Sequence, residues 1–436
     1  MTMNAQPSDE PKPRAQAFEA LRVPGFRAFL ATFMLSIMAD NIEHVISYWV
    51  VFQKFHSPAL GGFAVLSHWL PYLGLSVSVG ALNDRFDSRR LIQAGMAIFV
   101  TVSIGWGYFF VTDSLRVWHA MLLLVMHGCA GVFWLTSSQM LLYDIVGPVA
   151  LPSAVRLNAT ARYLGFIAGP AVGGLIMLTL GPTHGIFLNA VFYLPLILWL
   201  VGAPYGRHFR KDAPLPKRAV RALGDIIETI REVRHVPVLG AMITLAGAAS
   251  FFIGNSYQAQ MPSFATDLGH GNPGAAYSML LAADAAGALT AGFLLESRGG
   301  SLLKTKASSA FKLAMLWAAA LACFACVRSY PAALALLFTA GFFELSFSSM
   351  TQTLVQLHAP TETRGRVLGL FNMSALGMRA FSGVTVGLAG SLATVHISLA
   401  TSAILFIGAM TFVLWRFRPG AASSMATDAP VTSATS

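Results

Sequence analysis

The sequence contains few charged residues. Only 11% of its 436 residues are Asp, Glu, Lys or Arg, whereas 55% are hydrophobic and the mean hydropathy is +0.63. Ordinary soluble domains are about 25% charged. A chain with so little charge cannot cover a soluble surface without large apolar patches, which excludes a soluble globular protein, a disordered chain and a fibrous repeat. The composition therefore predicts an integral membrane protein.

Cysteine is also scarce, since the chain has only Cys129, Cys323 and Cys326. Three cysteines are too few for a disulfide framework. The last two form a C-x-x-C spacing with no other Cys or His nearby, so we interpret them as packing residues and expect no metal site and no cofactor. The H-E-x-x-H, G-x-S-x-G and P-loop patterns are missing too, which argues against an enzyme.

Long apolar runs, in contrast, are abundant. A membrane-spanning helix needs about 20 mostly apolar residues, because backbone groups cannot stay unpaired in hydrocarbon. The first 22 residues are polar and show no removable signal peptide. We predict twelve spans, at 26–52, 60–82, 91–111, 117–143, 157–180, 185–203, 237–261, 275–296, 307–327, 331–357, 367–392 and 395–415.

The basic residues fix the expected orientation. With the N-terminus inside, the outer segments contain only Lys54, Arg116 and Arg328, while Arg162 and Arg379 lie within spans. The other 24 of the 29 Lys and Arg residues fall on the cytoplasmic side. This asymmetry predicts a multi-pass protein of the inner (plasma) membrane with both termini cytoplasmic. It also accounts for the net charge of +10 without a nucleic-acid partner.

An offset of 212 positions relates the two halves. Residues 80–84 fall on 292–296, Pro148 falls on Pro360, and Gly165 falls on Gly377. An even number of spans separates the copies, so both have the same orientation. We therefore predict an all-α integral membrane fold, with twelve transmembrane helices in two parallel six-helix bundles. The expected divisions are an N-terminal tail (1–22), a first bundle (23–203), a linker (204–236), a second bundle (237–416) and a disordered tail (417–436).

The linker carries a pattern of its own. Its apolar residues recur at helical spacing opposite charged ones, which predicts an amphipathic helix on the inner membrane face. A plain connection between the bundles is compatible with this interpretation. The apolar positions are Val220, Leu223, Ile227 and Ile230, and the charged ones are Arg221, Asp225, Glu228 and Glu232.

The loop after the second span reads GALNDRFDSRR over residues 80–90. Its glycine permits close helix approach, and Asp84 can cap the next helix and pair with an arginine. Together with the twelve spans, the loop resembles the cytoplasmic signature of the major facilitator superfamily of secondary transporters, with Asp87 where glycine is usual. The resemblance implies a cytoplasmic gate, and a basic loop that only sets topology is the alternative. The gate residues are Gly80, Asp84, Arg85, Arg89 and Arg90.

The fifth span reads GFIAGPAVGG over residues 165–174. Glycines at four-residue spacing let a neighbouring helix approach, and a proline removes one backbone donor and kinks the helix. The pattern resembles an element of the antiporter-type, exporting branches of the superfamily. A packing seam of small residues is the alternative. The element comprises Gly165, Gly169, Pro170, Gly173 and Gly174.

Two further stretches, 151–158 and 360–367, resemble the branch that includes enterobactin-type siderophore exporters and macrolide exporters, so the chain as a whole resembles an enterobactin-type or multidrug exporter. The chain departs from the proton-antiporter pattern in span 4, where His127 replaces an arginine. This puts the family's usual arginine role in doubt. An imidazole with an ordinary pKa near 6.5 could titrate in its place, or it could be a packing residue.

The first span holds the densest set of ionisable residues. Asp40, Glu43 and His44 are three or four positions apart, so they share one face of the helix. Acids and an imidazole this close would be coupled, as a proton carrier requires. A polar network that fastens the span to its neighbours is the alternative. With His127, these residues are the proton-coupling candidates.

Other polar and aromatic residues lie within later spans. Ionisable groups in hydrocarbon are costly, so each calls for a partner or a function. We expect a substrate cavity walled by Asp284, Glu344, Arg379, Arg162, Trp69 and Tyr72.

The predicted function is secondary active transport of a small amphiphilic molecule by alternating access. The glycine–proline element of span 5 favours export in exchange for protons. Proton-coupled uptake of a nutrient is the alternative within this class, and a non-transporting membrane sensor or scaffold is the alternative outside it. The expected partners are a small-molecule substrate, protons and the lipid bilayer, with the chain acting as a monomer.

Overall fold

The computed structural model describes residues 16–206, 209, 220–268, 273–299, 303–382, 386 and 394–416. Most of the predicted N-terminal tail, the middle of the linker and the whole C-terminal tail lie outside these residues. So does the end of the predicted span 367–392, from residue 383 on, apart from residue 386.

The N-terminal half forms one bundle of long helices. A short 3₁₀ helix, η1 (Glu19–Arg22), precedes α1 (Phe26–Phe55), α2 (Pro58–Arg85), α3 (Ser88–Val111), α4 (Val117–Phe192) and α5 (Leu194–Gly202). The backbone leaves helical geometry inside α4 at Gly147 (φ 67°) and Gly181 (φ 74°). A left-handed glycine ends a helix, and each is followed by a proline, which suits the first turn of the next helix. These two points therefore divide α4 into three predicted crossings, the last of which continues into α5.

The first of these divisions differs from the sequence-based boundaries. Span 5 was expected to begin at residue 157, but its helix starts directly after Gly147. Hydropathy marks the part of a helix that lies in hydrocarbon, whereas the Gly147–Pro148 pair marks where the helix itself begins. The additional turns at 148–156 carry Ser153 and Arg156, which contact the other bundle.

The C-terminal half forms the second bundle and contains two irregular spans. Its helices are α6 (Leu223–Arg234), α7 (Pro237–Phe252), α8 (Ser256–Ala259), α9 (Met261–Asp267), α10 (Pro273–Ser297), α11 (Ala307–Cys326), α12 (Tyr330–His358), α13 (Arg364–Asn372), the π-helix η3 (Met373–Gly377), α14 (Arg379–Ser382) and α16 (Val395–Arg416).

The predicted span 237–261 is broken between α7 and α8, where Gly254 has a φ of 53°. The predicted span 367–392 changes from α- to π-helix at Met373. Breaks of this kind are tolerated at membrane depth where the backbone lines a cavity or packs within protein, and they often accompany functional sites.

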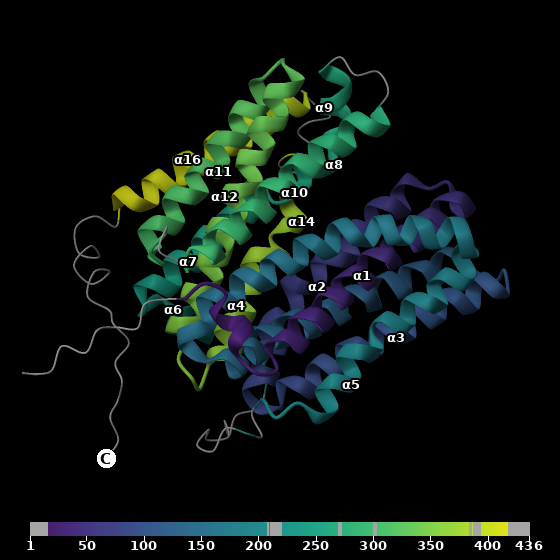
Figure 1. Cartoon of the computed structure of the whole chain (residues 1–436), viewed down its shortest axis with the longest axis horizontal. Coiled ribbons are helices and arrows are strands. Elements are labelled where there is room, and N and C mark those ends of the chain that lie inside the picture. The colour runs from purple at the N-terminus through teal and green to yellow at the C-terminus, as the bar shows by residue number, and fades with distance from the viewer. Residues whose placement is uncertain are drawn as a thin grey trace, which may run out of the picture.

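The two bundles meet at one end and diverge toward the other (Figure 1). Within the described residues, nine helices are long and apolar enough to cross a membrane, and one of them comprises the three crossings of α4 and α5. Each bundle has its own apolar core. Between bundles, α2 packs on α13 and η3, and α4 packs on α10 and α12. These features confirm the predicted all-α fold of two six-helix bundles.

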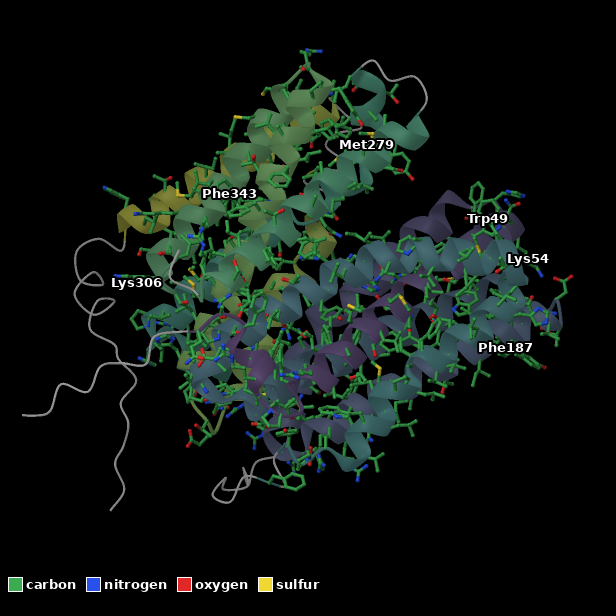
Figure 2. All side chains as sticks on the ribbon, viewed as in Figure 1. Trp49, Lys54, Phe187, Met279, Lys306 and Phe343 are labelled. Atoms are coloured by element: carbon green, nitrogen blue, oxygen red, sulfur yellow. The ribbon has the colours of Figure 1, made fainter. Side chains whose placement is uncertain are left out.

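Lys54 and Lys306 lie at opposite ends of the molecule (Figure 2). The predicted topology places Lys54 outside the cell and Lys306 in the cytoplasm, so the long axis of the helices separates the two predicted faces. The end that carries Lys306 is also the end at which the bundles meet.

The predicted linker helix is α6. Its polar Asp225 and Thr229 are buried against the protein, whereas Leu223, Ile227 and Ile230 are 74%, 52% and 43% exposed. The apolar stripe therefore faces away from the bundles, as a helix lying on a membrane surface requires. Its placement on the inner membrane face stays a prediction.

Candidate functional site

A cavity of 1110 Å³ lies between the two bundles. Both halves of the chain contribute to its walls, so its shape depends on how the bundles are oriented. Of the ten predicted coupling and substrate residues, eight line it. They are Asp40, His44, Trp69, Tyr72 and Arg162 from the N-terminal bundle and Asp284, Glu344 and Arg379 from the C-terminal bundle.

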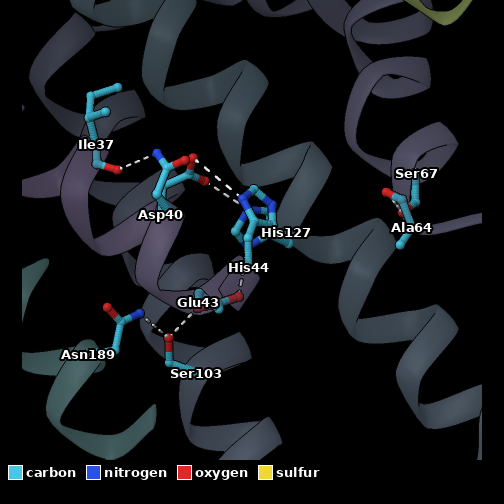
Figure 3. Close-up of polar contacts among 10 residues, drawn as sticks. Ile37, Asp40, Glu43, His44, Ala64, Ser67, Ser103, His127 and Asn189 are labelled. Carbon is cyan, nitrogen blue, oxygen red and sulfur yellow. Dashed lines mark hydrogen bonds and ion pairs between the residues drawn. The ribbon is translucent and has the colours of Figure 1, made fainter. Parts of the chain in front are cut away.

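The remaining two, Glu43 and His127, lie behind the cavity wall in a hydrogen-bonded network (Figure 3). The His127 ring bridges two carboxylates of α1, with Nε2 2.8 Å from Asp40 Oδ1 and Nδ1 2.7 Å from Glu43 Oε1. Ser103 donates to the other oxygen of Glu43. Asp40 is 8% exposed and Glu43 is 1% exposed, so the network leads from the cavity wall into the bundle.

Two more imidazoles lie beside this network. The ring of His44 is 4.6 Å from that of His127 and 4.9 Å from that of His68, measured between centroids. Nitrogens of the three rings lie within 4.8 Å of one another, a spacing that a metal ion could exploit. Both nitrogens of His127 already face carboxylates, however, so the geometry fits a shared proton better than a third metal ligand.

In the C-terminal bundle, Tyr257 joins two acids. Its hydroxyl is 3.2 Å from Asp284 Oδ2 and 3.3 Å from Glu344 Oε2, and Gln258 donates to Asp284 at 3.0 Å. A hydroxyl has one proton to donate, so it can serve only one of the two carboxylates at a time. Asp284 is 2% exposed.

Sequence reasoning missed Tyr257, Gln258, Ser103 and Asn189 as members of these two networks. Tyr257 and Gln258 follow the break in span 7, and the available signal was the polar run from Gly254 to Gln258 inside an otherwise apolar segment. Ser103 and Asn189 are isolated polar residues in apolar helices. Spacing within one helix could not show that they meet, with Asn189 donating to Ser103 at 3.4 Å.

The predicted gate residues divide into two groups. Gly80 packs directly on the backbone of Gly365, and Asp84 accepts hydrogen bonds from the backbone N–H groups of Gly365 (2.6 Å) and Arg366 (3.1 Å). Asp84 therefore caps the start of α13 in the other bundle. The expectation that it caps the next helix was wrong, because Asp87 takes that role and accepts from the N–H of Arg89 at 2.9 Å.

The three basic gate residues contact their own bundle. Arg89 forms an ion pair with Asp87 at 2.7 Å and donates to the carbonyl of Ala203, and Arg90 donates to Gln93. Arg85 lies over the ring of Phe86. Burial raises the pKa of the Asp87 carboxyl, but hydrogen bonds from Arg89 outweigh it and hold that pKa below its ordinary value. Asp87, which stands where the superfamily signature usually has glycine, thus gives Arg89 a fixed ion-pair partner.

A second contact joins the bundles at the same end. Glu296 of α10 is buried and accepts hydrogen bonds from Ser153 and from Nε of Arg156, the latter at 2.8 Å. We call the contacts of Asp84 with α13 and of Glu296 with α4 the latch.

The glycines of the span 5 pattern line a helix seam. A Cβ added to Gly165, Gly169 or Gly173 would meet residues 37–45 of α1, whereas one added to Gly174 would meet nothing within 4 Å. Three of the glycines are therefore required for close packing on the helix that carries Asp40 and Glu43. Pro170 is exposed, and the helix continues through it.

Known proteins are similar to this chain in sequence and in fold. The model of the Major Facilitator Superfamily matches residues 28–383. The multidrug efflux pump Tap of Mycolicibacterium fortuitum is 24% identical over 403 residues, covering 88% of this chain and 94% of Tap. The enterobactin exporter EntS of Shigella flexneri is 25% identical over 410 residues, covering 91% of this chain and 93% of EntS.

Among solved structures, the E. coli fucose:proton symporter FucP superposes with a TM-score of 0.70 at 12% identity, covering 90% of this chain and 98% of FucP. These similarities identify a small-molecule transporter of the inner membrane and not an enzyme. The chain belongs to the major facilitator superfamily.

Proposed function

We propose that this protein exports a small amphiphilic molecule in exchange for protons by alternating access. The observation that carries the proposal is the bridge of His127 between Asp40, on the cavity wall, and Glu43, deep in the bundle. A proton that reaches Asp40 from the cavity is passed through His127 to Glu43, which is buried away from water. Such a site can take up a proton on one side of the membrane and release it on the other.

The direction of the open cavity agrees with proton entry from outside. The latch joins the bundles at the end that carries Lys306, and the predicted topology makes that end cytoplasmic. We therefore propose that this arrangement is an outward-facing state, in which the cavity releases substrate and receives protons. Protonation of Asp40 would weaken its charge-assisted contact with His127 and so loosen α1 from the crossing of α4 that carries His127.

Two further observations support export. Gly165, Gly169 and Gly173 pack span 5 on α1, so a movement of the proton-carrying helix is transmitted to the helix with the exporter-type pattern. The relatives Tap and EntS are both named for efflux or export. Transfer of that direction to this chain is part of the proposal.

The test uses purified protein in proteoliposomes with an imposed pH gradient, and 2-naphthoate and ethidium as anionic and cationic probes. We expect Asp40→Asn to abolish gradient-driven movement of the transported probe while the protein remains folded. Asp113→Asn is the matched control. Asp113 is an acid beside Lys54, at the end of the molecule away from the latch, and its side chain is 93% exposed. Unchanged transport by Asp40→Asn would remove this residue from the mechanism, and accumulation in the direction of proton flow would establish uptake instead.

A further inference from the structure

Two arginines from different bundles face the same cavity. Arg162 belongs to α4 and Arg379 begins α14, and both line the main cavity and a smaller pocket of 70 Å³ beside it. In the described part of the chain, neither guanidinium forms a hydrogen bond or an ion pair, and Nε of Arg379 is buried without a partner. A guanidinium at membrane depth without a partner is costly, so a ligand that pairs with it is the expected occupant.

The acids around the cavity, in contrast, already have donors. Asp40 is bonded to His127, Asp284 to Gln258, and Glu344 lies against the Tyr257 hydroxyl. Asp284 Oδ1 is also buried without a hydrogen-bond partner among the described residues, but each of these carboxylates has a donor at one oxygen, whereas neither guanidinium has any hydrogen-bond partner there. An organic cation would meet acids that already have one donor each, whereas an anion would complete two guanidinium groups that have none.

The local charge balance leads to the same conclusion. Glu344 is the acid that interacts electrostatically with both Arg162 and Arg379, and the two arginines also repel each other. Asp284 has Glu344, Tyr257 and Gln258 as its electrostatic partners. Two guanidinium groups thus have one carboxylate as their common electrostatic partner, and the acidic group of a ligand could complete the pairing.

Aromatic rings surround this charge. The guanidinium carbon of Arg379 lies 5.0 Å from the ring centroid of Trp69, and the rings of Trp69 and Tyr72 are 6.1 Å apart. Trp69 belongs to the N-terminal bundle and Arg379 to the C-terminal one, so the contact spans the cavity. An aromatic ligand could stack on these rings while its acidic group reaches the arginines.

We propose that Arg162 and Arg379 form the binding site for the acidic group of an amphiphilic aromatic anion, such as an aromatic carboxylate. The proposal rests on the proposed function in taking this anion as the transported substrate. Because the two arginines come from different bundles, one anion between them links the bundles when it binds. Glu344 acts as an internal electrostatic competitor for the two arginines while the site is empty.

The test compares three probes with one aromatic body, namely 2-naphthoate, 2-naphthylmethylammonium and 2-naphthylmethanol. Equilibrium binding is measured on the purified full-length protein in detergent, without a gradient. We expect 2-naphthoate to bind at least about tenfold more tightly than the other two. Arg162→Gln and Arg379→Gln should each weaken 2-naphthoate about tenfold and leave 2-naphthylmethanol unchanged, which shows that the pocket is intact.

Two variants sharpen the result. Glu344→Gln removes the internal competitor and should strengthen 2-naphthoate binding, a change that damage to the fold would not produce. Arg328→Gln is the matched control, because Arg328 is exposed outside the cavity. Preference for 2-naphthylmethylammonium, or unchanged 2-naphthoate binding in both cavity variants, overturns the proposal. Because this assay needs no proton gradient, its outcome is independent of whether Asp40 couples transport to protons.

Discussion

Glu296 lies 212 positions after Asp84, and the two acids make equivalent contacts in opposite directions. Asp84 accepts from the backbone of Gly365, and Glu296 accepts from Ser153, which lies 212 positions before Gly365. The internal repeat therefore has a structural counterpart, since each bundle supplies one acid that accepts hydrogen bonds from the other bundle. The latch is a duplicated contact, and its two halves open together when the bundles separate.

Removal of one latch acid should shift the conformational equilibrium. Asp84→Ala leaves the N–H groups of Gly365 and Arg366 without their acceptor, at a cost of about 1–3 kcal/mol in the closed latch. The open-latch population should rise roughly 5- to 150-fold. Spin labels at Arg90→Cys and Glu362→Cys, with the three native cysteines replaced by serine, report the distance between the bundles. Asp113→Ala is the control, and an unchanged distance distribution in Asp84→Ala would contradict a role for this acid.

The two glycines of the latch permit a second test. A Cβ added to Gly80 would overlap the carbonyl of Gly365, and the reverse also holds. Gly80→Ala should therefore keep the latch apart and favour the open form in the same spin-label measurement. Gly74 lies in the same helix and has nothing within 4 Å of an added Cβ, so Gly74→Ala should behave as the unsubstituted protein. Equal effects of the two alanines would show that helix propensity, and not close approach, is responsible.

Much of the fold was predictable because membrane depth constrains the sequence so strongly. Hydropathy and charge asymmetry gave twelve spans in two related halves, and the ionisable residues within spans pointed to the cavity walls. Breaks were harder to predict, because Gly254 and Met373 interrupt segments that are long enough and apolar enough overall to predict continuous spans. Hydropathy measures the cost of leaving water and does not register backbone geometry.

Contacts between distant helices could not be predicted. The spacing of Asp40, Glu43 and His44 placed them on one face of α1, but nothing in that helix identifies His127, more than eighty positions later, as the residue that binds two of them. Likewise, the Asp84 carboxylate was expected to cap the neighbouring helix. It caps α13 instead, because the packing of Gly80 on Gly365 brings that helix start within reach.

Loss of His127 should destabilise the protein. His127→Leu leaves Asp40 and Glu43 buried without their common partner, and removal of one member of a buried charged group costs about 3–5 kcal/mol. Thermal unfolding in detergent should show a clear decrease, most of which Asp40→Asn and Glu43→Gln together should reverse by removing the unpaired charges. His184→Leu, at an exposed histidine, is the control. A decrease that the neutral pair does not reverse would indicate lost packing in place of lost charge pairing.

Asp87 should contribute a pH-dependent component of stability at the end of the molecule that carries the latch. Its pKa in the folded protein is below the ordinary value of about 4, because Arg89 stabilises the carboxylate. A depressed pKa contributes stability that is present above the unfolded value and is lost as pH falls through the folded value. Asp87→Asn keeps an N-cap side chain but removes this charge. The difference in unfolding temperature between the unsubstituted protein and Asp87→Asn should therefore be constant near neutrality and shrink below about pH 4. A difference that stays constant down to the lowest measurable pH would show that the Asp87–Arg89 pair adds no net stability.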